Sequence, residues 1–95
     1  MSLLFEWDPN KAESNLAKHD VSFEEAMTVF ADPLARIFPD EDHSVDELRE
    51  IIIGHSAHHQ LLLVNFTGTE DRVRIISART TTHRERKDYE ENVAT

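Results

Sequence analysis

Three apolar segments in the second half of the chain constrain its fold more than any other feature. They cover residues 47–54, 60–67 and 72–79, and each is rich in Ile, Val and Leu and bounded by turn-forming residues. The sequence Gly-Thr-Glu-Asp at residues 68–71 predicts a tight hairpin between the last two segments. Because connections this short cannot join parallel strands, the three segments predict an antiparallel meander.

A short strand and a helix are predicted at the start of the chain. Residues 3–7 form an apolar run suited to a strand. Asp8 followed by Pro9 is typical of a helix N-cap and the first helical position. The helix that begins there is expected to extend to about Lys18.

A second helix has a stronger start signal. Ser22 and Glu25 have the spacing of a capping box, in which each side chain bonds the backbone N–H of the other. Asp32-Pro33 ends the helix, because the residue before a proline is disfavoured in helical geometry. Between these signals, apolar residues recur at helical spacing: Phe23, Ala26, Met27 and Phe30.

The remaining segments complete an α+β pattern. Residues 34–38 predict a short edge strand, and a further capping box, Thr82 with Glu85, begins a last helix. The predicted order is strand, helix, helix, four strands, helix. We therefore expect residues 1–95 to form a single α+β domain, an antiparallel β-sheet meander with two N-terminal helices and one C-terminal helix.

Composition excludes several classes of protein. The chain has no cysteine, which rules out disulfide scaffolds, cysteine-based zinc sites and thiol nucleophiles. Two glycines are too few for a P-loop or a dinucleotide-binding fingerprint. The apolar runs are far shorter than the roughly 20 residues of a membrane helix, and the N-terminal residues lack the pattern of a signal peptide. A cytoplasmic protein without membrane segments is the expectation.

Charge is distributed unevenly along the chain. The net charge of −9 lies in residues 1–50, which hold 13 acids and 4 bases, whereas residues 51–95 hold 6 of each. Six of the ten cationic side chains fall between Arg72 and Lys87. Five of these six are arginines, whose planar guanidinium suits phosphate. This pattern suits either a local anion-binding site on an otherwise acidic protein or a solvated strand edge and helix face.

The cationic segment offers a phosphate site at the junction of its strand and helix. Strict alternation along the strand places Val73, Ile75 and Ser77 on one face and Arg72, Arg74, Ile76 and Ala78 on the other. Four side chains are then expected to converge near the helix N-terminus, which itself attracts anions: Arg74, Arg79, His83 and Arg86. The alternative is that Arg79 and Arg86 pair with Glu85, Glu90 or acids of the first half.

Histidines suggest two further sites. His55, His58 and His59, with Glu50 and His43 near them in sequence, resemble a metal cluster, but their spacing matches no established zinc pattern. No metal and no cofactor are therefore predicted. Lys18 and His19 end the first helix, where cations favour the helix dipole, and the same pair is suited to proton transfer.

Several of these motifs together resemble the BrnT family of toxins. The resemblance runs from about residue 5 to residue 91, with the motifs in the same order and spacing. They are FEWDPNK at 5–11, NLAKH at 15–19, VSFEEA at 21–26, IGHS at 53–56, RIISAR at 74–79, RER at 84–86 and YE at 89–90.

This resemblance implies a type II toxin with a RelE-like fold that acts as a ribonuclease and halts translation. It also implies a BrnA-type antitoxin as partner, with operator DNA contacted through the antitoxin. The polar positions of the family pattern fall on Lys18, His19, Arg74, Arg79, Glu85 and Arg86. Two positions depart from the pattern: Asp20 stands where the family often has glycine, and residues 57–60 replace a basic Gly-Arg turn.

The expected function is that of a metal-independent endoribonuclease. Arg79 and Arg86 are expected to clamp the phosphate, and His83 or Glu85 to transfer the proton, although Glu85 has an alternative role as a helix cap. The residues expected to contact the RNA are Arg72, Arg74, Lys18 and His19. The alternative function is a catalytically weak or inactive module that binds the antitoxin, favoured by the net charge and the missing Gly-Arg turn.

Overall fold

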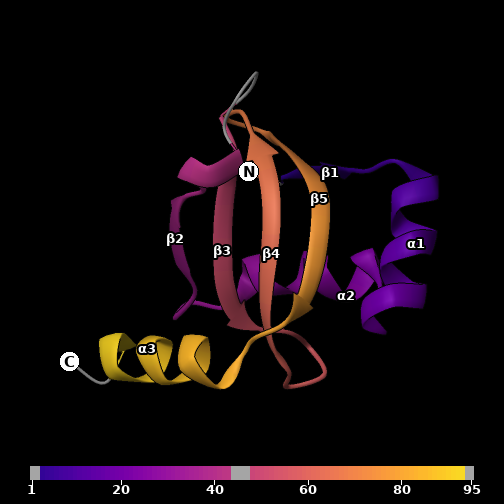
Figure 1. The fold of residues 1–95 in the computed structure, drawn as a ribbon. Coiled ribbons are helices and arrows are strands. Elements are labelled where there is room, and N and C mark those ends of the chain that lie inside the picture. Colours follow the sequence, from indigo (N-terminus) through magenta and orange to yellow (C-terminus); the bar gives the residue numbers. More distant parts are fainter. Residues whose placement is uncertain (1–2, 44–47, 94–95) are drawn as a thin grey trace.

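The computed structural model describes residues 3–43 and 48–93. They form an α+β fold with three α-helices and a five-stranded sheet (Figure 1). The elements are, in chain order, β1 (Leu4–Glu6), α1 (Pro9–His19), α2 (Phe23–Thr28), η1 (Val29–Ala31), β2 (Arg36–Pro39), η2 (Glu41–His43), β3 (Glu50–His55), β4 (Leu61–Gly68), β5 (Arg72–Thr80) and α3 (His83–Val93). The predicted order of helices and strands is confirmed. Glu47, the expected start of the third strand, lies outside the described residues.

The sheet has the strand order β1-β5-β4-β3-β2. β2 to β5 pair antiparallel with their neighbours in sequence, which confirms the predicted meander. β1 joins the outer edge of β5 in parallel, with Glu6 opposite Arg74. The sheet is therefore mixed, a feature that the short N-terminal run did not reveal because its partner lies at the other end of the sequence.

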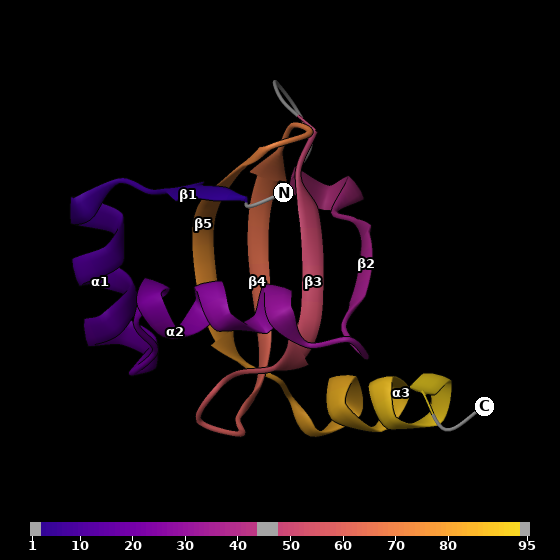
Figure 2. The same ribbon diagram turned by 180° about the vertical axis from the view of Figure 1, so that it is seen from behind.

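Helices cover the two faces of the sheet unequally. α2 crosses one face, α1 stands beside β5, and α3 crosses the opposite face near one end of the sheet (Figures 1 and 2). The main core lies between the sheet and the first two helices, and its buried members include Phe23, Ala26, Ile52, Val64 and Ile75. A smaller cluster beneath α3 contains Ile53, Leu61, Leu63 and Tyr89. None of the described helices is sufficiently long and apolar to cross a membrane.

Local capping explains where α1 begins and ends. Asp8 accepts a hydrogen bond from Asn10 N at 2.8 Å, and Pro9 occupies the first turn, as the sequence predicts. Asp20 terminates the helix in the left-handed conformation, with φ of 58°. Glycine adopts this conformation without a steric penalty, which gives a physical reason for the glycine that the BrnT pattern often has here.

The two predicted capping boxes differ in the structure. Around α3 both bonds form: Thr82 N donates to Glu85 Oε1 at 2.8 Å, and Glu85 N donates to Thr82 Oγ1 at 3.2 Å. Around α2, Ser22 Oγ accepts from Glu25 N at 3.0 Å. The Glu25 carboxylate, however, accepts from Ser56 Oγ and from the Gln60 side chain, so it ties α2 to the β3–β4 turn.

A β-bulge in β5 overturns the predicted alternation of its side chains. Asn65 pairs with Ser77 and the next residue of β4, Phe66, pairs with Ile75, so Ile76 is an extra residue in the strand. Ala78 consequently lies in the main core with Val73 and Ile75, whereas the sequence placed it with Arg72 and Arg74. The same shift moves Ser77 to the opposite face and brings Arg79 onto the face that carries Arg74.

Candidate active site at the β5–α3 junction

Arg79 and Glu85 form a bidentate ion pair where β5 leads into α3. The guanidinium Nη1 and Nη2 donate to Glu85 Oε1 and Oε2 at 2.8 and 2.9 Å. The β5 bulge directs Arg79 to this face, and the capping box with Thr82 holds Glu85. The hydrogen bonds from Arg79 hold the pKa of the Glu85 carboxyl at about 2, and the same pairing raises the pKa of Arg79.

The Arg79–Glu85 pair lies at the wall of a groove of about 750 Å³ between β2, the open face of the sheet and α3, which we call the α3 groove. Its apolar lining consists of Ile37, Phe38, Ile51, Ile53 and Leu63. Two arginines face four carboxylates in it: Arg36 and Arg79 against Asp40, Asp42, Glu85 and Asp88. The groove is therefore apolar at its base and acidic in balance.

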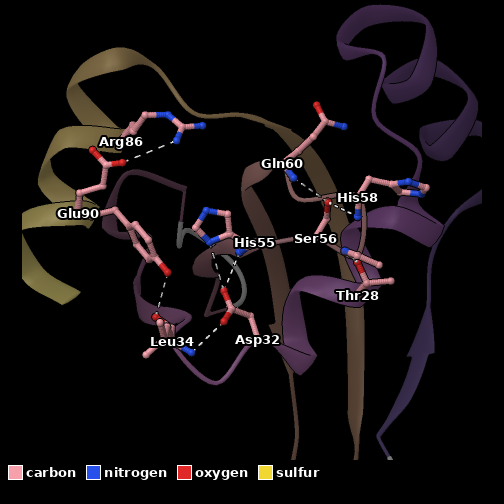
Figure 3. Close-up of polar contacts among 11 residues, drawn as sticks. Thr28, Asp32, Leu34, His55, Ser56, His58, Gln60, Arg86 and Glu90 are labelled. Atoms are coloured by element: carbon pink, nitrogen blue, oxygen red, sulfur yellow. Dashed lines mark hydrogen bonds and ion pairs between the residues drawn. The ribbon is translucent and has the colours of Figure 1, made fainter. Parts of the chain in front are cut away.

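Arg86 and His83 lie on the first turn of α3, beside the Arg79–Glu85 pair in sequence. Both side chains are exposed. The Arg86 guanidinium lies 3.8 Å from Glu90 Oε2, one helical turn onward, which is an ion pair longer than a hydrogen bond (Figure 3). Within the described residues, His83 has no side-chain hydrogen bond or ion pair. Arg86 is therefore more accessible to an added phosphate than Arg79 is.

Arg72 and Arg74 belong to a different part of the surface. Both donate to the carboxylate of Glu6 on the neighbouring strand, at 3.3 and 3.2 Å. Arg79 lies five positions after Arg74 in β5, which is about 16 Å along a strand. The expected convergence of Arg74 with the residues of the junction is therefore wrong, because β1 pairs with the opposite end of β5.

Lys18 and His19 occupy a third location. They lie in the last turn of α1 and line a small hollow together with Ser77 and Ile76 of β5. α1 stands beside β5 at one edge of the sheet, whereas α3 leads away from the end of β5 toward β2 at the opposite edge (Figures 1 and 2). The structure thus divides the predicted site residues among three places.

The histidine-rich turn contributes one side chain that the sequence did not single out for catalysis. His55 Nδ1 lies 3.7 Å from Asp32 Oδ2 (Figure 3). The His55 ring meets Tyr89 edge-on, with ring centroids 5.8 Å apart. Among residues 3–43 and 48–93, no three histidine or carboxylate groups gather as metal ligands, and the His43 side chain lies outside what is described. No local signal indicates the contact of Asp32 with His55, since 23 residues separate them.

Comparison with known proteins agrees with this architecture. The family model for the ribonuclease toxin BrnT of type II toxin-antitoxin systems matches residues 7–85. The chain belongs to the BrnT family. The matched segment runs from the residue after β1 to the third residue of α3, so it includes Arg79 and Glu85.

A solved BrnT structure has the same fold. The crystal structure of the Brucella abortus ribonuclease toxin BrnT superposes with a TM-score of 0.63 and 23% sequence identity, covering 87% of this chain and 99% of that one. Comparison with curated proteins gives no match. The fold predicted from the resemblance is therefore confirmed, and this chain is a member of a family of ribonuclease toxins.

Proposed function

We propose that this BrnT-family protein is a metal-independent endoribonuclease that inhibits translation and is neutralised by a BrnA-type antitoxin. The observation that carries the proposal is the bidentate pair between Arg79 and Glu85. A guanidinium that grips a carboxylate with two parallel hydrogen bonds has the geometry that also binds a phosphate. Glu85 then occupies the position that a scissile phosphate takes, and Arg86 supplies a second cation on the next residue.

The reaction that suits these groups is an internal transesterification. The ribose 2′-oxygen attacks the adjacent phosphorus, the bond to the 5′-oxygen breaks, and the products are a 2′,3′-cyclic phosphate and a 5′-hydroxyl. The nucleophile belongs to the substrate, so the protein has to stabilise charge on the phosphorane and accept one proton. Arginines perform the first task and cannot perform the second, because they stay protonated.

Glu85 is a poor choice for the proton acceptor. Its pKa of about 2 makes it a weak base, and both of its oxygens already accept hydrogen bonds from Arg79. Its geometry supports the alternative role considered from the sequence, that of a helix cap. Glu85→Gln keeps the capping geometry and removes the charge, so it is expected to raise the affinity for RNA by freeing Arg79.

A second function is favoured by the ion pairs themselves. All four arginines expected to bind RNA face a carboxylate: Arg72 and Arg74 with Glu6, Arg79 with Glu85, and Arg86 with Glu90. The apolar and acidic α3 groove suits a basic protein segment better than it suits RNA. These observations support a catalytically weak toxin fold whose main role is to bind the antitoxin.

Expression of the chain with and without the neighbouring antitoxin tests the two functions. A ribonuclease slows growth when expressed alone, and co-expression of the antitoxin restores growth. The purified toxin should also cleave RNA to fragments with 2′,3′-cyclic phosphate ends. Normal growth, with soluble and folded protein that binds the antitoxin but leaves RNA intact, would establish the binding module instead.

A further inference from the structure

The proposed ribonuclease reaction needs a proton acceptor that the β5–α3 junction does not supply. Glu85 is bonded to Arg79 through both carboxylate oxygens. His83 is exposed, and no described side chain holds its ring in one orientation. A general base has to be held within hydrogen-bond distance of the proton that it removes, so an unrestrained ring is a weak candidate.

His55, at the end of β3, is held in place from two sides. Its backbone N–H donates to Asp32 Oδ2 at 2.7 Å, and its ring Nδ1 lies 3.7 Å from the same oxygen. On the other side, the His55 ring packs edge-on against Tyr89 of α3 at an interplanar angle of 67°. Tyr89 is buried and its hydroxyl donates to Leu34 O, so the ring against which His55 packs is itself fixed.

Asp32 has the environment of a positioning residue. Its side chain is only 11% exposed, and its Oδ1 accepts a hydrogen bond from Leu34 N at 2.9 Å. With Oδ1 held in this way, Oδ2 faces both the backbone N–H and the ring Nδ1 of His55 (Figure 3). Oδ2 lies 3.7 Å from Nδ1, beyond hydrogen-bond distance, and its negative charge favours the tautomer with the proton on Nδ1, which leaves the Nε2 lone pair free to accept a proton.

An arginine lies on the helix that contacts the His55 ring. Tyr89, which contacts His55, follows Arg86 by three residues on α3, and side chains at this spacing are neighbours on one helix face. The His55 side chain is 46% exposed, as is that of Arg86. The end of β3 thus presents an imidazole with a carboxylate behind it, next to the helix that carries an accessible guanidinium.

We propose that His55 is the general base of this protein, that Asp32 positions it, and that Arg86 binds the phosphate beside it. This inference rests on the proposed ribonuclease function. His55 Nε2 takes the proton of the ribose 2′-hydroxyl as the bond from O2′ to phosphorus forms. The bond from phosphorus to the 5′-oxygen breaks, the leaving oxygen takes a proton from water, and the imidazolium returns its proton to solvent.

The alternative is that His55 has only a structural role: it would pack against Tyr89 and take no part in the reaction. Chemical rescue separates the two roles, because imidazole added to solution can replace a missing base and cannot replace a missing packing contact. The purified full-length chain is therefore assayed as the parent and as His55→Ala, with His58→Ala as the matched control. His58 lies three residues further along, on the exposed turn after β3, and its backbone N–H donates to Ser56 Oγ, a bond that the substitution preserves.

We expect His55→Ala to lose about 10²- to 10⁴-fold in the rate of RNA cleavage, the scale for removing a general base. Added imidazole should restore part of this rate, and the thermal midpoint should stay close to that of the parent. His58→Ala should cleave within threefold of the parent. Asp32→Asn should cleave more slowly than the parent and should gain less from imidazole than His55→Ala, because its histidine is still present.

The outcomes separate this inference from the proposed function. A parent that cleaves RNA, with His55→Ala within threefold of it, would overturn the role of His55 and leave the ribonuclease standing. A loss in His83→Ala without a loss in His55→Ala would assign the proton transfer to His83. A folded parent that cleaves no RNA would overturn both proposals. If His55→Ala is poorly folded, His55→Gln is assayed in its place with the same criteria.

Discussion

Asn15 of α1 and Ala78 of β5 exchange hydrogen bonds as two paired strands do. Asn15 Nδ2 donates to Ala78 O at 2.8 Å, and Ala78 N donates to Asn15 Oδ1 at 3.0 Å. β1 pairs with the edge of β5 only from Arg72 to Arg74. Beyond β1, the side-chain amide of Asn15 bonds the backbone N–H and C=O that Ala78 presents at this edge. The same Nδ2 also donates to Val21 O at 2.9 Å, which links the helix, the strand and the turn between the helices.

Asn15→Ala should therefore destabilise the fold strongly. Asn15 is 6% exposed, and its loss leaves buried backbone groups of Ala78 and Val21 without partners. We expect a fall of about 2–4 kcal/mol in the free energy of unfolding, since each such group costs about 1–3 kcal/mol. Urea denaturation measures this, with Asn10→Ala on the exposed face of α1 as control. A loss below 1 kcal/mol, on the order of an ordinary surface substitution, would show that water replaces the amide.

The two glycines should respond differently to replacement by alanine. A Cβ on Gly54 would lie 2.8 Å from Ala35 Cβ and 3.0 Å from Asp32 Oδ2, whereas the nearest atom to a Cβ on Gly68 is 3.5 Å away. Gly54→Ala is expected to cost about 1–3 kcal/mol through overpacking. Gly68→Ala should change stability by no more than about 0.5 kcal/mol. Thermal melts of the two variants compare them directly, and equal midpoints would contradict this prediction.

The Arg79–Glu85 pair should make stability depend on pH in acid. Folding lowers the pKa of Glu85 from 4.5 to about 2, so the stabilisation is complete above about pH 4.5 and is lost as the pH falls toward 2. Solvent screens this partly exposed pair, so we expect about 1 kcal/mol at neutral pH and low salt. The difference in free energy of unfolding between the parent and Glu85→Gln isolates this contribution from the other acids. A difference that is unchanged from pH 7 to pH 2.5 would show that the charge of Glu85 does not stabilise the fold.

Arg79 and Arg86 should matter for cleavage beyond their effect on folding. If each donates to the phosphorane, replacement by alanine should slow cleavage by about 10²- to 10³-fold. Lysine should rescue only part of this loss, because it lacks the bidentate guanidinium. Cleavage rates and thermal melts are measured on the same preparations.

The control for the arginine variants is Arg84→Ala, an exposed cation on the same turn of α3. It should cleave within threefold of the parent. A loss confined to Arg86→Ala would exclude Arg79 from phosphate binding and leave Arg86 as the phosphate-binding residue. Folded Arg79→Ala and Arg86→Ala proteins that both cleave within threefold of the parent would exclude both residues from phosphate binding.

Cleavage should continue in excess EDTA at the rate measured without it. The nucleophile of the proposed reaction is the 2′-hydroxyl of the substrate, and arginine supplies the charge stabilisation that a metal ion would otherwise provide. The assay compares EDTA-treated toxin with toxin supplemented with zinc or magnesium. Loss of cleavage in EDTA that zinc alone restores would mean that the histidine-rich turn binds a catalytic metal after all.

Local sequence signals were sufficient for the elements and their order. The Asp8-Pro9 start, the Thr82–Glu85 capping box and the hairpin at residues 68–71 each depend on groups only a few residues apart. Such signals act before any tertiary contact forms, so they can be recognised in the sequence alone. The BrnT family could also be identified from the sequence, by the order and spacing of its motifs.

Tertiary structure decided which side chains meet. Glu6 pairs with Arg74 across 68 residues, and the β5 bulge, formed against β4, directs Arg79 toward Glu85 instead of into the core. The contact of Asp32 with His55 likewise joins the end of η1 to the end of β3. These contacts depend on strand register and on which sheet edge is left open, and neither property belongs to a short stretch of sequence.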